Sequence, residues 1–188
     1  MKNLDFLKNK IKHLEKLVYK DELTGAYNRR GFLEISKKFL KEIKTNQTKE
    51  KRKKNLIKNC SLILFDIDNF KKINDVFGHS AGDKALKVLC LEIKNRIRDL
   101  DIIGRWGGEE IVVLLIGADK MHAYQVADYI RKKIENKKIK INGKIINFTI
   151  SGGVADFKKY QEFQKVFDLA DQALYKAKKT GKNKIVVA

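Results

Sequence analysis

The chain has 188 residues, 43% of them hydrophobic and 35% charged, which fits one compact domain and argues against a disordered or multidomain protein. Its longest unbroken apolar run, residues 111–116, is far shorter than the roughly 20 residues of a membrane helix, and its charged start lacks the apolar segment of a signal peptide. Cys60 and Cys90 lie in apolar stretches without C-x-x-C spacing, which excludes a disulfide framework and a structural zinc site. We therefore expect a cytoplasmic protein without a membrane span.

The charge balance is strongly basic, with 42 Lys and Arg residues against 23 Asp and Glu residues and a formal net charge of +19. Such an excess is typical of proteins that meet polyanions, namely nucleic acids, anionic membrane surfaces or phosphorylated small molecules. Much of the excess lies in residues 41–58 and 176–184. Solvation of an ordinary surface explains it equally well, so charge alone identifies no partner.

Residues 1–20 are predicted to form an N-terminal helix, because apolar side chains recur there at spacings of three and four. The apolar positions are Leu4, Leu7, Ile11, Leu14 and Val18. Only about two heptads are present, so a short coiled coil and packing of this helix on its own domain both remain open. Residues 21–188 are expected to form the domain itself.

Within the domain, helical and strand patterns alternate. A helix is predicted over residues 30–43, and the polar, basic segment at about 45–59 has no periodicity and is predicted to be a long inserted connection. A short apolar run ending in acids predicts a buried strand over 61–68. The later predicted elements are a helix over 80–98, strands over 102–106 and 111–116, a helix over 121–136, strands over 138–141 and 146–152, a helix over 163–178 and a strand over 184–187.

Carboxylates gather at two strand ends. Asp66 and Asp68 share one face of the first strand by its period of two, and Glu109 and Glu110 follow the Gly-Gly pair of a predicted hairpin. If these strands pair, the acids converge, repel one another and favour a divalent cation such as Mg²⁺. Two such ions catalyse phosphoryl and nucleotidyl transfer. The alternative is that strand-end acids simply face water.

Four motifs in order resemble one known family. They are Asp-Glu-Leu-Thr-Gly-Ala-Tyr-Asn-Arg-Arg from residue 21, Asp-Ile-Asp-Asn-Phe-Lys-Lys-Ile-Asn-Asp-Val-Phe-Gly-His-Ser-Ala-Gly-Asp over 66–83, Gly-Gly-Glu-Glu at 107–110, and Ala-Leu-Tyr-Lys-Ala-Lys-Lys-Thr-Gly-Lys-Asn over 173–183. The pattern is similar to that of the GGDEF domain, the diguanylate cyclase family. The resemblance implies an α/β fold of the α+β type, with a palm-like, mostly antiparallel central sheet of about five strands flanked by helices.

The resemblance also implies a reaction. Two GTP molecules, held by two facing domains of a homodimer, become cyclic di-GMP and two pyrophosphates, with each 3′-hydroxyl attacking the other nucleotide's α-phosphate. The implied cofactor is Mg²⁺, with Mn²⁺ as the alternative ion. The alternative function is a catalytically silent module that binds GTP or cyclic di-GMP as a receptor. The presence of the acidic residues that the family uses for catalysis disfavours this alternative. Nucleic-acid binding rests on charge alone and is not expected.

By match to the family's motifs, the implied metal ligands are Asp66, the backbone carbonyl of Ile67, Glu109 and Glu110. Glu109 is further implied as the catalytic base for the 3′-hydroxyl; a metal-bound carboxylate is a poor proton acceptor, so a role as ligand only remains open. Gly107 and Gly108 are implied to let the backbone approach the phosphates, although a Gly-Gly pair also simply makes a turn.

Substrate contacts follow in the same way. Asn74 and Asp83 match the guanine-reading positions, and the alternative for Asp83 is a capping box with Ser80 at a helix start. The implied phosphate contacts are Asn69, Phe70, Lys71, Lys178 and Lys182. Lys182 stands where arginine is commoner in the family, which replaces a bidentate contact with a point charge.

Four further positions complete the comparison. Arg98 and Asp101 match the RxxD motif that binds the inhibitory product, and a solvated charge cluster is the alternative. Ile111 stands where the signature usually has phenylalanine, a mild change at a core-facing strand position. His79 is expected to be a buried structural residue.

Overall fold

The computed structural model describes residue 10 and residues 17–49, 59–141, 144–157 and 162–188. The predicted seam from Leu4 to Leu14 and most of the predicted basic insertion lie outside these residues. Residues 17–19 are helical, with the side chains of Leu17 and Val18 exposed. Within the described ranges, every helix is too short or too polar to cross a membrane.

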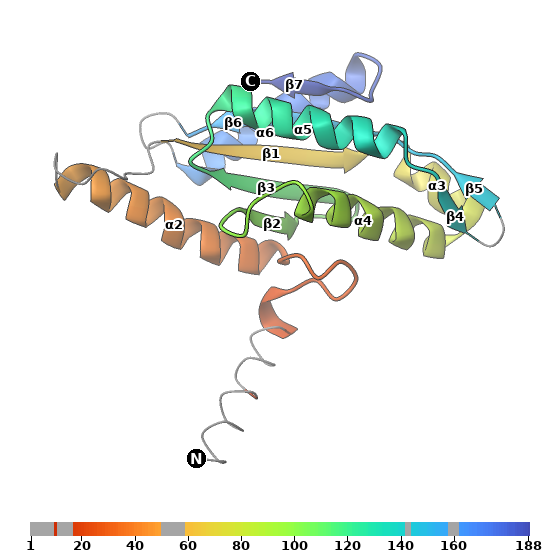
Figure 1. The fold of residues 1–188 in the computed structure, drawn as a ribbon, viewed down its shortest axis with the longest axis horizontal. Helices are drawn as coiled ribbons and strands as arrows, with labels where there is room; N and C mark the ends of the chain where they lie inside the picture. Colours follow the sequence, from red (N-terminus) through yellow and green to blue (C-terminus); the bar gives the residue numbers. More distant parts are fainter. Residues whose placement is uncertain (1–9, 11–16, 50–58, 142–143, 158–161) are drawn as a thin grey trace.

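A five-stranded sheet in the order β2-β3-β1-β6-β7 forms the centre of the fold (Figure 1). Its strands are β1 (Cys60–Ile67), β2 (Ile102–Arg105), β3 (Glu110–Ile116), β6 (Ile150–Asp156) and β7 (Ile185–Val187). All neighbours are antiparallel except β6 and β7. The predicted fold class, a mostly antiparallel sheet of about five strands flanked by helices, is confirmed.

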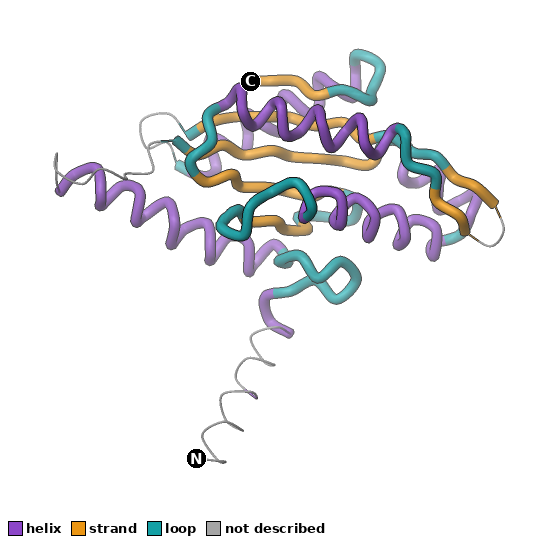
Figure 2. The backbone as a smooth tube through the Cα atoms, in the orientation of Figure 1, coloured by secondary structure: helices purple, strands orange, loops and turns teal. Residues whose placement is uncertain are grey.

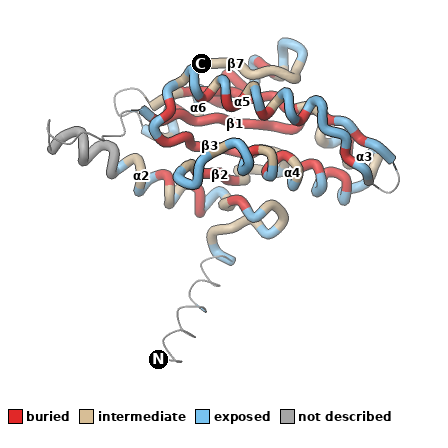
Figure 3. Tube along the Cα trace, in the orientation of Figure 1, coloured by how far each residue is buried: buried red, intermediate tan, exposed pale blue. Residues whose placement is uncertain are grey.

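Helices cover both faces of the sheet, as Figure 2 shows. They are α2 (Arg29–Lys49), α3 (Phe70–Phe77), α4 (His79–Lys94), α5 (Lys120–Glu135) and α6 (Phe163–Lys179). All eight residues of β1 are buried (Figure 3) because its side chains alternate between two apolar layers. Ile63 and Phe65 pack in the layer that contains α4 and α5 residues, whereas Leu62 and Leu64 pack in the layer of α2 and α6.

Three predicted boundaries are wrong for identifiable reasons. α2 continues to Lys49 instead of ending near residue 43, because the added residues include no glycine or proline. The strand expected over 146–152 is two strands: β5 (Lys144–Ile146) pairs with β4 (Ile139–Ile141) in a small separate sheet, and β6 starts at Ile150. β6 continues past the predicted end at residue 152 to Asp156. Its glycines belong to the strand because α6 packs closely against them: a Cβ at Gly153 would lie 1.9 Å from the carbonyl oxygen of Ala170.

Both ends of α4 also differ from expectation, since the helix ends at Lys94 and not near residue 98. The helix begins at His79 after Gly78, which has a positive φ of 83°, and it has no side-chain cap. Ser80 therefore lies inside the first turn, and the predicted capping box with Asp83 is not formed. His79 is exposed instead of buried. Helix α3, which precedes it, was not foreseen, since eight residues are too few for a clear helical period.

Candidate active site

Acids meet at one end of the sheet, on the face covered by α6. Asp66 of β1 lies opposite Glu110 of β3, and Glu109 directly precedes that strand. Asp66 is buried, and its pKa is raised to about 6: burial raises it most, contact with Lys178 opposes the rise, and Glu109 and Glu110 add to it. The Nζ of Lys178 lies 2.7 Å from Asp66 Oδ2. The expected convergence of these three acids is therefore present.

Asp68 does not join them. Its buried carboxylate accepts hydrogen bonds from Thr149 Oγ1 at 2.7 Å, from Ser151 Oγ at 2.7 Å and from the backbone N–H of Asn183 at 3.0 Å. The expectation of four clustered acids is thus wrong for Asp68, whose charge is satisfied by the fold. Among the described residues, no three Asp, Glu, His or Cys side chains are close enough to form a metal site as they stand.

The signature hairpin is held by a clamp that sequence reasoning missed. Arg105 donates to the carbonyl oxygen of Gly108 from Nε at 3.1 Å and from Nη2 at 2.7 Å, and its Nη1 pairs with Asp21 Oδ2 at 3.0 Å. The other oxygen of Asp21 accepts from the N–H and hydroxyl of Thr24. The Asp-x-x-Thr segment at residues 21–24 therefore anchors the loop that carries Gly107 and Gly108.

Replacing Asp21 with Asn should destabilise the domain by about 1–3 kcal/mol at pH 7, because the ion pair and a charged acceptor are lost. The pKa of Asp21 lies below its usual value of 3.8: burial raises it, but the hydrogen bonds from Thr24 and the charge of Arg105 outweigh burial. A carboxylate with a lowered folded-state pKa stabilises the fold above its unfolded-state pKa, and this contribution is lost as pH falls through the folded-state value.

Urea unfolding should accordingly show a gap between the wild type and D21N at pH 7 that narrows below about pH 4. Asp75→Asn, a change at an exposed acid, serves as the control and should leave the free energy of unfolding nearly unchanged at both pH values. A D21N gap that stays constant from pH 7 to pH 3 would contradict the role given to the ionised carboxylate.

The two glycines of the signature have different surroundings. A Cβ at Gly107 would lie 2.5 Å from Glu110 Oε2, so glycine there lets the carboxylate fold back over the loop. A Cβ at Gly108 would meet no atom within 4 Å. Gly108 is exposed, so the space in front of it is open to a ligand.

The expected guanine-reading residues lie together on α3 and α4. The side-chain Oδ1 of Asn74 is buried and has no hydrogen-bond partner, and a Cβ at Gly82 would lie only 2.1 Å from it. Asp83, the residue after Gly82 on α4, is exposed. An unpaired buried amide oxygen is costly unless a ligand pairs with it. Asn74 and Asp83 thus offer unmet acceptors of the kind that the N–H groups of guanine satisfy.

The expected phosphate contacts are also brought to the acid end of the sheet. Asn69 has a left-handed backbone, φ 56°, and its side chain accepts a hydrogen bond from Lys182 Nζ. Lys178 contacts Asp66, as described above. Lys71 is exposed and Phe70 is half-buried at the start of α3. Lys178 and Lys182 are therefore close to the segment that follows β1, while Lys71 faces solvent.

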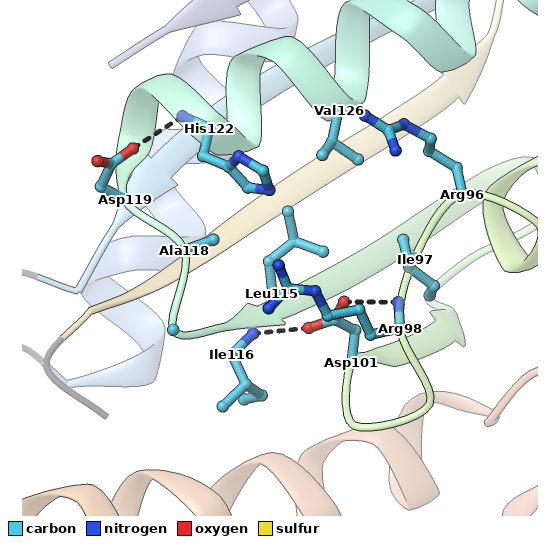
Figure 4. Close-up of a pocket in the computed structure, with 11 residues that line it drawn as sticks. Arg96, Ile97, Arg98, Asp101, Leu115, Ile116, Ala118, Asp119, His122 and Val126 are labelled. Carbon is cyan, nitrogen blue, oxygen red and sulfur yellow. Dashed lines mark hydrogen bonds between the residues drawn. The ribbon is translucent and has the colours of Figure 1, made fainter. Parts of the chain in front are cut away.

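Arg98 and Asp101 lie at the other end of β3, away from the acids. They line a pocket of about 420 Å³ between the loop at 96–101 and the start of α5 (Figure 4). Asp101 accepts from the backbone N–H groups of Ile116 and Arg98, each at 2.9 Å. Its carboxylate therefore organises this loop, while the Arg98 side chain is exposed at the pocket.

Sequence comparison identifies the same family across most of the chain. The sequence model of the family described as "Diguanylate cyclase, GGDEF domain" matches residues 18–184. Diguanylate cyclase DgcM of Escherichia coli is 35% identical over 175 residues, which is 93% of this chain and 40% of that protein. Diguanylate cyclase DgcP of Pseudomonas aeruginosa is 42% identical over 127 residues, which is 68% of this chain and 19% of that protein. The chain thus spans less than half the length of either relative.

Solved structures agree in fold. The coiled coil and GGDEF domain of DgcB from Caulobacter crescentus, in complex with c-di-GMP, has a TM-score of 0.88 at 23% identity over 99% of this chain and 94% of that one. Diguanylate cyclase SiaD of Pseudomonas aeruginosa, in complex with its activator SiaC, has a TM-score of 0.79 at 27% identity over 100% of this chain and 68% of that one. The chain belongs to the diguanylate cyclase family of GGDEF domains.

Proposed function

We propose that this chain is an active diguanylate cyclase that condenses two GTP into cyclic di-GMP and two pyrophosphates. The observation that carries the proposal is the meeting of Asp66 with Glu110 across β1 and β3, where Lys178 contacts Asp66. Carboxylates for metal ligation and cations for phosphate binding thereby occupy one end of the sheet. We further propose that the enzyme acts in the cytoplasm.

The donor set fits Mg²⁺ or Mn²⁺. Hard divalent cations prefer carboxylate and carbonyl oxygens, which Asp66, the Ile67 carbonyl, Glu109 and Glu110 would supply. The raised pKa of Asp66, about 6, and its contact with the Lys178 ammonium support a need for positive charge here. When bound, the ions lower the pKa of the attacking hydroxyl and neutralise charge on the phosphates.

The chain's own residues bind and orient the nucleotide. Asn74 and Asp83 accept hydrogen bonds from the guanine edge, which discriminates against adenine because adenine lacks this donor pattern. The phosphates are neutralised by the ammonium groups of Lys71, Lys178 and Lys182. The backbone at Asn69 and Phe70 donates hydrogen bonds to them. Glu109 either takes the proton of the 3′-hydroxyl as a general base or serves only as a metal ligand.

One domain holds one GTP, so two copies must face each other. Each nucleotide then supplies its 3′-hydroxyl to the α-phosphate of the other. Leu17 and Val18, 52% and 43% exposed at the entry to the domain, support a helix that continues toward a second copy. Such a tether raises the effective concentration of the two halves of the active site.

The rival function is a silent receptor that binds GTP or cyclic di-GMP without turnover. A continuous assay of pyrophosphate release separates the two, with purified chain, GTP and Mg²⁺. The proposal predicts sustained release that chelation of the metal stops. Saturable GTP binding with no pyrophosphate release would instead establish the receptor.

Removing residues 1–16 should lower activity per molecule, most strongly at low protein concentration, because two domains then meet only by diffusion. This truncation keeps Val18 and Tyr19, whose carbonyl oxygens accept from Asn28. Leu7→Asp should act in the same way, whereas Lys8→Asp, off the predicted seam, should not. Initial rates measured across a dilution series test this, and unchanged specific activity at every dilution would refute the tether.

Replacing Arg98 with Ala should relieve inhibition by added cyclic di-GMP by about tenfold or more, without lowering the initial rate. The reason is that Arg98 is exposed at a pocket at the far end of β3 from the acids. Inhibition curves of wild type and R98A test this, with Arg96→Ala as a control at the same pocket. If R98A is inhibited as strongly as wild type, this motif does not bind the inhibitory product.

A further inference from the structure

The loop that follows α6 has an unusual backbone. Gly181, Lys182 and Asn183 all have positive φ values, 111°, 61° and 46°. Left-handed conformations are disfavoured for residues with a Cβ, and two such residues in succession persist only where surrounding contacts hold them. The backbone N–H of Lys182 donates to the carbonyl oxygen of Ala177 at 3.0 Å, and Asn183 provides further contacts.

Three polar groups of Asn183 form hydrogen bonds. Its backbone N–H donates to Asp68 Oδ2 at 3.0 Å. Its Nδ2 donates to Glu135 Oε1 at 2.7 Å, and its Oδ1 accepts from Arg131 Nη1 at 3.0 Å. These partners come from the end of β1 and from the last two turns of α5, so Asn183 joins two elements that are distant in sequence.

The α5 side of this junction is itself braced. Arg131, with a side chain 12% exposed, also pairs with Asp128 at 2.8 Å and with Glu135 at 2.9 Å. The pKa of Glu135 is lowered, chiefly by the hydrogen bond from Asn183 and then by Arg131. The side chain of Asn183 thus donates to a carboxylate, Glu135, and accepts from a guanidinium, Arg131, that are themselves held in place.

Lys182 is held by the same arrangement. It directly precedes Asn183, and its Nζ donates to the side chain of Asn69. Asp68 and Asn69, neighbours at the end of β1, therefore bind Asn183 and Lys182, neighbours in the loop. A lysine ammonium on a flexible stem loses less entropy on binding a phosphate when its backbone is already placed.

We propose that Asn183 is a positioning residue that, braced by Arg131 and Glu135 of α5, fixes Lys182 for the terminal phosphates of the nucleotide. This inference rests on the proposed function, which assigns phosphate binding to Lys182. Nothing in the family motifs assigns a role to Asn183, Arg131 or Glu135.

The test uses an isosteric change. Asn183→Asp keeps the acceptor toward Arg131 but loses the Nδ2 donor and places a carboxylate against Glu135. We expect its dissociation constant for 3′-deoxy-GTP, which lacks the attacking hydroxyl and binds without turnover, to rise about tenfold. Affinity for GMP, which lacks the terminal phosphates, should stay within about twofold. A merely structural defect would weaken both ligands alike.

Two further substitutions make the result specific. Glu135→Gln alone is the matched control and should bind 3′-deoxy-GTP like wild type, because its amide oxygen still accepts from Asn183. Combined with N183D it should restore affinity, since the Gln amide now donates to the new carboxylate. In a Lys182→Ala background N183D should have no further effect, because the residue it positions is gone.

Calorimetric titration of the full chain with 3′-deoxy-GTP and GMP provides these constants. Equal losses for both nucleotides, no rescue by E135Q, or an undiminished effect of N183D in the K182A background would each overturn the inference. Because the titration needs no turnover, a wild type that binds 3′-deoxy-GTP but makes no cyclic di-GMP refutes the proposed function and not the positioning.

Discussion

Replacing Glu110 with Gln should lower the rate of cyclic di-GMP formation by at least about a thousandfold while the domain stays folded. Glu110 lies opposite Asp66, so the change removes a negative charge from the place where the proposed metal ligands meet. The amide has the same shape as the carboxylate, so it can still fold back over Gly107, whose missing Cβ leaves that space. Glu109→Gln should have a comparable effect, as a metal ligand or as the base.

Rates of wild type, E109Q and E110Q in saturating GTP and Mg²⁺ test this expectation. Glu34→Gln, a change at an exposed acid of α2, is the control for a general effect of charge and should leave the rate unchanged. Circular dichroism and thermal unfolding should show folded variants. If E110Q turns over at the wild-type rate, the assignment of Glu110 to the metal site is wrong.

Replacing Gly82 with Ala should weaken GTP binding about 10- to 100-fold, although Ala normally favours a helix over Gly by up to about 1 kcal/mol. The new Cβ would lie 2.1 Å from Asn74 Oδ1 and 2.9 Å from Phe70 Cζ. The end of a side chain moves more easily than backbone, so Asn74 must swing away. Under the proposed function, guanine then loses one of the two side chains that recognise it.

Titration of G82A with 3′-deoxy-GTP and with 3′-deoxy-ATP tests this, since the preference for guanine should shrink together with affinity. The double variant with Asn74→Ala separates packing from recognition. Removing the Asn74 amide relieves the closest clash and leaves only the end of the Phe70 ring to shift, so thermal stability should recover in part while guanine affinity stays low. Wild-type affinity in G82A would show that Asn74 does not read the base.

Much of the fold could be predicted because its central strands are strongly patterned. The run ending in Asp66 is apolar on both faces, which predicts the buried central strand, and Gly107-Gly108 between two apolar runs predicts the β2–β3 hairpin. The approach of Asp66 to Glu110 depends on the pairing of β1 with β3, which the sequence alone leaves as a condition. Motif matching, not periodicity, identified Asn74 and Lys182 as candidate ligand contacts.

What was missed depends on contacts between distant residues. Asp68 has the same sequence context as Asp66, and only the positions of Thr149, Ser151 and Asn183 show that its charge is used internally. The clamp from Arg105 to Gly108 likewise requires Asp21, 84 residues away. Local patterns predict elements and their edges, but they carry no information on which side chain satisfies which partner.

The most direct test of the central account, that two copies act on two GTP, is the identity and stoichiometry of the product. Purified chain is incubated with GTP and Mg²⁺, and the nucleotides are separated by chromatography and weighed by mass spectrometry. The account predicts one cyclic di-GMP and two pyrophosphates for every two GTP consumed. Cyclic GMP with one pyrophosphate per GTP, simple hydrolysis to GDP, or unchanged GTP would contradict it.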